Sequence, residues 1–171
     1  MLPVYVLIDH SSSIKEAERF ALNSAVAQLF QDMSASLDAP DIWVSVCTFG
    51  QAPMILHPLM PLEQVLPPNL HDGVGGSDLG LALGFVSTLA SFPYQWGDDQ
   101  PCRPCLVIFC DEECAVSDSS LRWSALRDQF SVVMLCSLRD SLLFDVGEEV
   151  VRMTVSTLRG GGFSSRLHWK E

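Results

Sequence analysis

Basic residues are scarce in this sequence. Of its 171 residues, 10 are lysine or arginine, against 21 aspartates and glutamates, and the formal net charge is −11. A surface of this sign repels a phosphate backbone, and no basic stretch with interleaved aromatic residues offsets it. The shortage of positive charge therefore argues against nucleic-acid binding.

Long apolar runs are also missing. The longest, residues 5–8 and 105–110, fall far short of the roughly 20 residues that a helix needs to cross a bilayer. Residues 1–8 are apolar, but they carry no basic segment, and Asp9 ends the run before a signal-peptide core could form. We therefore expect a cytoplasmic protein without a membrane span.

Charged residues make up only 18% of the chain and hydrophobic residues 48%, a balance that argues against disorder and for a packed core. The length suits one domain. We expect a single domain over residues 1–171, with residues 159–171, which include three consecutive glycines, as a C-terminal tail segment. A core of this size needs no disulfides, so we expect the six cysteines to be buried free thiols.

Two short, β-rich and wholly apolar runs, residues 4–8 and 106–109, have the composition of central parallel strands covered on both faces. Each is followed closely by an aspartate, Asp9 or Asp111. Further strands are expected at 42–49 and 54–60, as an antiparallel edge pair, and at 130–136 and 150–155. Apolar periodicity and helix-start signals predict helices at 14–37, 79–89, 117–129 and 142–149. This alternation predicts an open α/β sheet, which binds ligands beyond the carboxyl ends of its strands.

The sequence Asp9-His10-Ser11-Ser12-Ser13 places a carboxylate and hydroxyls on one tight loop at the end of the first strand. Hard cations such as Mg²⁺ take oxygen ligands of this kind. Asp and Ser also cap helices, and a helix is expected from Ile14. Taken alone, the loop is thus either a metal site or a helix cap.

Two later features complete a pattern. Ser77 precedes a second helix after a glycine-rich stretch, and Asp111 follows the strand at 106–109. With these the chain resembles the von Willebrand factor A-domain family, whose metal-ion-dependent adhesion site reads D-x-S-x-S, then Thr, then Asp. Asp9, Ser11, Ser13, Ser77 and Asp111 match those positions in order. The resemblance implies a doubly wound α/β fold: a mostly parallel central sheet with one antiparallel edge strand and helices on both faces.

The same resemblance implies the chemistry of the site. Ser11 and Ser13 would bind Mg²⁺, or Mn²⁺ or Ca²⁺, directly, Ser77 would do so in a ligand-competent state, and Asp9 and Asp111 would act through waters. Neutral hydroxyl ligands leave much of the cation's charge uncompensated, so an Asp or Glu of a partner protein is attracted to the open position. The expected function is protein binding rather than enzymatic turnover.

Three short segments sharpen the resemblance. Residues 2–5, 43–46 and 59–62 are similar to bacterial tellurite-resistance proteins of the TerY type. This closer likeness implies a role in a bacterial stress response.

The chain departs from the family pattern at three places. Ser77 keeps the hydroxyl of the usual Thr but lacks its stiff β-branch. Glu112 and Glu113 stand where the family usually has Gly, and they would tighten metal binding, complete the coordination sphere or repel an acidic partner. His10 offers an imidazole to Zn²⁺ or Mn²⁺, although a solvated histidine is the simpler interpretation. The expected rim of the site is thus His10, Ser12, Asp78, Glu112 and Glu113.

A zinc site is one rival interpretation, because Cys102, Cys105, Cys110 and Cys114 form closely spaced pairs. The expected strand between Cys105 and Cys110 argues against it. At about 3.3 Å per residue the two thiols lie some 16 Å apart, too far to share one ion.

A metal-dependent phosphoesterase or related hydrolase with Asp9 as nucleophile is the other rival. Such an enzyme would be expected to have a second Asp at position 11, which is Ser11 here. The glycine-rich residues 73–76 lack the Lys-Ser/Thr of a phosphate-binding loop, and no G-x-S-x-G motif supports a serine hydrolase. The sequence therefore favours a binding module over an enzyme.

Overall fold

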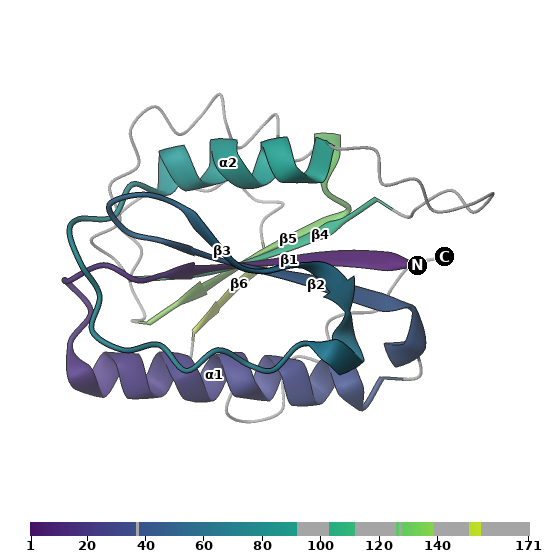
Figure 1. Cartoon of the computed structure of the whole chain (residues 1–171), viewed down its shortest axis with the longest axis horizontal. Coiled ribbons are helices and arrows are strands. Elements are labelled where there is room, and N and C mark those ends of the chain that lie inside the picture. Colours follow the sequence, from purple (N-terminus) through teal and green to yellow (C-terminus); the bar gives the residue numbers. More distant parts are fainter. Residues whose placement is uncertain (37, 92–102, 112–125, 127, 139–150, 155–171) are drawn as a thin grey trace.

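A computed structural model describes residues 1–36, 38–91, 103–111, 126, 128–138 and, for the backbone, 151–154 (Figure 1). The expected helix at 142–149, most of the one at 117–129 and the tail at 159–171 lie outside these residues. So do Glu112, Glu113, Cys102 and Cys114.

The described strands form one six-stranded sheet in the order β3-β2-β1-β4-β5-β6. Only β2 and β3 pair antiparallel, and the other neighbours are parallel. The strands span β1 Leu2–Asp9, β2 Ile42–Phe49, β3 Met54–Pro61, β4 Cys105–Cys110, β5 Val132–Ser137 and β6 Val151–Thr154. This is the mostly parallel sheet with one antiparallel edge strand that the sequence predicts.

Two long helices cover opposite faces of the sheet (Figure 1). Helix α1, Glu16–Ser34, belongs to the core cluster that contains Val4, Val6 and Ile8 of β1. Helix α2, Leu79–Ser91, packs in a second cluster with Tyr5 and Leu7. Because alternate side chains of a strand point to opposite faces, a strand buried on both must be apolar at every position. The doubly wound α/β prediction is confirmed.

Two one-turn 3₁₀ helices complete the described elements: η1, Ala39–Asp41, leads into β2, and η2, Leu62–Gln64, follows β3. The predicted element bounds differ from those observed by at most three residues. Residues 130 and 131 precede β5 rather than belonging to it, because the N–H of Phe130 donates back to the carbonyl oxygen of Leu126 over 2.8 Å. The Phe130 ring packs edge-on against Tyr5, with ring centroids 6.1 Å apart. Within the described residues, no helix is both long enough and apolar enough to cross a membrane.

The four described cysteines, Cys47, Cys105, Cys110 and Cys136, are buried free thiols, as predicted. Burial disfavours the charged thiolate. It raises the pKa of Cys47 to about 11. The pKa of Cys136 is raised further, by burial and secondarily by the neighbouring Cys110. The thiols of Cys47 and Cys136 therefore stay protonated in the folded chain at neutral and mildly basic pH.

We predict that Cys47 and Cys136 resist alkylation in the native state, because only the thiolate reacts. Iodoacetamide treatment at pH 8, followed by peptide mass spectrometry, should leave both unmodified. The same treatment in denaturant should modify both. Rapid native labelling of either would contradict the burial that the fold requires.

Candidate metal centre

Asp9 and Asp111 lie at the same edge of the sheet because they end neighbouring parallel strands. Asp9 is the last residue of β1, and Asp111 directly follows β4. The strands are in register, with Ile8 opposite Phe109. Asp9 is 0% exposed and Asp111 is 3% exposed. Two carboxylates are therefore buried side by side at the carboxyl end of the sheet, where charge is costly unless it is compensated.

The loop after β1 links these two carboxylates through a backbone N–H and two serine hydroxyls. The backbone N–H of Ser11 donates to Asp9 Oδ1 over 2.8 Å, an Asx turn that folds the loop back on the strand end. The Oγ atoms of Ser11 and Ser13 are 2.7 Å apart, and Ser13 Oγ donates to Asp111 Oδ2 over 2.6 Å. One continuous chain of hydrogen bonds thus links four of the five predicted ligands.

The serines of this loop do not cap α1. The N-cap residue is Lys15, and its backbone N–H donates to the Glu18 carboxylate over 3.0 Å. The hydroxyls of Ser11, Ser12 and Ser13 hydrogen bond elsewhere. The helix-cap interpretation of the D-x-S-x-S pattern is therefore wrong for this loop.

The segment that carries Ser77 lies against the same loop. The backbone N–H and the hydroxyl of Ser12 both donate to the carbonyl oxygen of Gly75, over 3.0 and 2.8 Å. Ser77 follows two residues later and is partly buried. Asp78 caps α2, because its Oδ1 accepts the N–H of Leu81 over 3.0 Å. Among the described residues, no hydrogen bond joins Ser77 to the other four predicted ligands.

Glycines allow the loops of the site to pack backbone against backbone. A Cβ at Gly73 would lie 2.4 Å from the carbonyl oxygen of Ser11, and one at Gly50 would lie 2.9 Å from that of His10. Gly75 has a φ of +73°, which side-chain-bearing residues rarely adopt. This packing role of Gly73 and Gly50 is not visible in the sequence, because a glycine in a loop or after a strand gives little signal of what packs against it.

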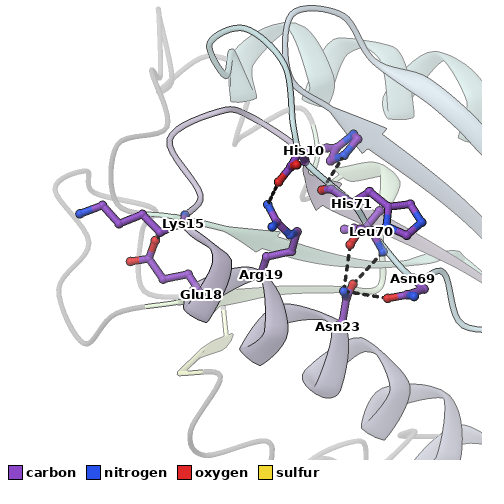
Figure 2. A network of polar contacts seen from close by, with 9 residues as sticks. His10, Lys15, Glu18, Arg19, Asn23, Asn69, Leu70 and His71 are labelled. Atoms are coloured by element: carbon purple, nitrogen blue, oxygen red, sulfur yellow. Dashed lines mark hydrogen bonds and ion pairs between the residues drawn. The ribbon is translucent and has the colours of Figure 1, made fainter.

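His10 lies in the loop after β1 and contacts the segment that precedes α2. Its Nε2 lies 3.2 Å from the carbonyl oxygen of His71, and Figure 2 shows the two residues side by side. In the part of the chain that the structure describes, no group of three or more His, Cys, Asp or Glu side chains is placed to hold a metal. Of the four cysteines in the possible zinc pattern, the structure describes Cys105 and Cys110. These two lie at opposite ends of β4, as expected for thiols that share no zinc ion.

The oxygen donors present fit a divalent cation. In an octahedral Mg²⁺ site with bonds of about 2.1 Å, neighbouring ligand oxygens are about 3.0 Å apart. The Oγ atoms of Ser11 and Ser13 are 2.7 Å apart, close to that spacing. A hydroxyl can offer its lone pairs to a cation while donating its hydrogen to a carboxylate, as Ser13 donates to Asp111. Ser11 and Ser13 would bind such a cation, and Asp111 would orient Ser13.

The fold is shared with solved structures of low sequence identity. Proximal thread matrix protein 1 from the mussel byssus matches 94% of the chain at a TM-score of 0.68 and 14% identity. A structure of the same protein, described as having a zinc-occupied MIDAS motif, matches at 0.65 and 16% identity. In each, the chain spans 46% of the mussel protein.

An aerotolerance-related membrane protein from Bacteroides fragilis, with multiple mutations to serines, also matches. The match covers 94% of this chain and 96% of that one, with a TM-score of 0.58 and 12% identity. No family model and no curated protein matches the sequence. The comparisons establish the von Willebrand factor A-type fold.

The loop of residues 10–13 is called the serine loop below. We predict that Gly73→Ala destabilises the chain by about 1–3 kcal/mol, because the new methyl group would overlap backbone carbonyls of the serine loop. Gly76→Ala is the matched control in the same segment, since a Cβ there meets nothing within 4 Å. Gly84→Ala, within α2 and equally unobstructed, should stabilise by roughly 0.5–1 kcal/mol. Urea unfolding measures all three. Equal stability of Gly73→Ala and Gly76→Ala would contradict the close packing of the loops.

Proposed function

We propose that the chain is a divalent-cation-dependent protein-interaction module. The observation that carries the proposal is the hydrogen-bonded chain Asp9–Ser11–Ser13–Asp111, which gathers two buried carboxylates and two hydroxyls at the carboxyl edge of the sheet. A cation there lowers the cost of burying two carboxylates together. Ser11 and Ser13 bind it directly, and Ser77, on the adjacent segment, joins them in the ligand-competent state.

The donor set determines what else the site accepts. Hydroxyl ligands are neutral, so the cation keeps an attraction for an outside carboxylate. The partner is therefore a protein that presents an Asp or Glu side chain. The chain as a whole is acidic, with a net charge of −11, so the cation also offsets repulsion between the partner's carboxylate and this surface.

The choice of cation follows from oxygen ligation, which suits Mg²⁺, Mn²⁺ and Ca²⁺. The zinc in the mussel neighbour's MIDAS motif adds Zn²⁺ to the ions to be tested. The TerY-type likeness of residues 2–5, 43–46 and 59–62 supports a bacterial stress or tellurite-resistance setting in the cytoplasm.

Binding rather than catalysis is the proposed outcome. Ser11 stands where a phosphotransferase would need an acid/base aspartate, and its hydroxyl hydrogen bonds with another serine hydroxyl. Residues 10–13, which follow Asp9, thus include no second carboxylate that could serve as the general acid.

We predict that Mg²⁺ or Mn²⁺ raises the melting temperature of the wild-type chain, because a ligand that prefers the native state stabilises it. Ser11→Ala combined with Ser13→Ala should abolish most of this increase. Differential scanning calorimetry with and without each cation measures it. Ser24→Ala with Ser34→Ala is the matched control, because both hydroxyls bond only to carbonyls of α1. A wild-type melting temperature that no cation changes would overturn the metal site.

We also predict no hydrolysis of generic phosphoesters by the Mg²⁺- or Mn²⁺-loaded chain above the rate of the metal alone. Release of nitrophenolate from p-nitrophenyl phosphate provides the measurement. Turnover that disappears in Asp9→Asn would replace the binding function with a phosphoesterase.

A further inference from the structure

A long segment without helix or strand crosses α1 and ends at the proposed metal site. It comprises residues 66–77, between η2 and α2, and is called the strap below. Its last residue is Ser77, the predicted ligand that has no hydrogen bond to the others. The strap is held at its site end by the two hydrogen bonds that Ser12 donates to the carbonyl oxygen of Gly75, and its middle is held from α1.

Asn23 of α1 holds the middle of the strap in both directions. Its Nδ2 donates to the carbonyl oxygen of Leu70 over 3.0 Å and to Asn69 Oδ1 over 3.1 Å. Its Oδ1 accepts the backbone N–H of Leu70 over 2.9 Å. The side-chain amide thus pairs with Leu70 as a neighbouring strand would (Figure 2). Asn is a poor helix former, and here its amide is used entirely outside its own helix.

Two further contacts extend this attachment toward the site. Arg19, one helical turn before Asn23, forms an ion pair with Asp72 at 2.7 Å. His10, inside the serine loop, lies 3.2 Å through Nε2 from the carbonyl oxygen of His71. Asp72 is 90% exposed, so its ion pair is weak. Asn23 is therefore the principal attachment.

A small pocket connects the attachment to the metal site. Its lining includes Asp9, His10 and Ser11 of the site, and Arg19, Leu70 and His71 of the attachment. Gly73, also in its lining, approaches the carbonyl oxygens of His10 and Ser11 so closely that a Cβ would not fit. A shift of the strap at Leu70 is thus passed directly to the serine loop.

We propose that Asn23 is a positioning residue for the metal site, and that its amide holds the strap so that Ser77 lies within reach of the cation. The inference rests on the proposed function, since it assigns a role within the same site. Asn23 contacts neither the cation nor the partner. Its effect reaches the site through Leu70, Gly73 and Gly75, the last of which accepts both hydrogen bonds from Ser12.

The test measures metal binding separately from stability. Asn23→Ala should raise the Mn²⁺ concentration for half-saturation about tenfold, as is typical when an outer residue that orients a metal site is removed. Asn23→Asp should weaken binding as well, because it keeps the acceptor for the Leu70 N–H but loses both donors. Gln28→Ala is the control: it removes another amide from α1, one that bonds to Asp32 within the helix. Isothermal titration calorimetry with Mn²⁺ supplies the affinities.

Hydrogen exchange without metal provides the second measurement. Asn23→Ala should speed amide exchange across residues 70–77 and leave β1 and β4 protected, whereas Gln28→Ala should not change the strap. Faster exchange with weaker Mn²⁺ binding supports the role of Asn23. Mn²⁺ affinity within twofold of wild type, or unchanged exchange in the strap, would overturn it. If the wild-type chain does not bind Mn²⁺, the proposed metal site itself is overturned. This outcome is distinguishable from the two results for Asn23→Ala that would overturn only the role of Asn23.

Discussion

The parallel pairing of β1 with β4 is the constraint on which the rest of the site depends. Both strands are buried on both faces, so their register is fixed by two hydrophobic clusters at once. That register brings Asp9 and Asp111 to one edge, buried and linked through Ser11 and Ser13. The polar residues do not create this geometry. They lie where the apolar core brings the carboxyl ends of β1 and β4 together.

The fold was largely predictable because its signals are local. Wholly apolar strands that stop at an aspartate, and helices with apolar residues every third or fourth position, have few alternative interpretations. The bounds of β2 were predicted to the residue. The start of α1 was placed two residues early, because Ile14 is apolar and buried although the Lys15–Glu18 contact begins the helix later.

The site was predictable only in part. Spacing within one loop singled out Asp9, Ser11 and Ser13, and a strand end singled out Asp111; the structure brings these four residues together, and their metal ligation stays a prediction. The contributions of Gly50 and Asn23 were not visible, because each depends on contacts with residues distant in sequence. Asn23 meets Leu70 across 47 positions, and a single asparagine on a helix carries no periodic signal. Which loops would pack together depended on tertiary structure, which no local pattern encodes.

The bond between Ser13 and Asp111 joins residues 98 positions apart, and this distance has a consequence for how the chain folds. The serine loop, α1 and the β2–β3 hairpin can all form early from nearby sequence, but the site does not exist until β4 docks beside β1. Contacts of such long range are formed late and at a high cost in loop entropy. A growing or truncated chain that ends before β4 would carry every serine of the pattern but not Asp111, so the hydrogen-bonded arrangement of Asp9, Ser11, Ser13 and Asp111 exists only once β4 has docked beside β1.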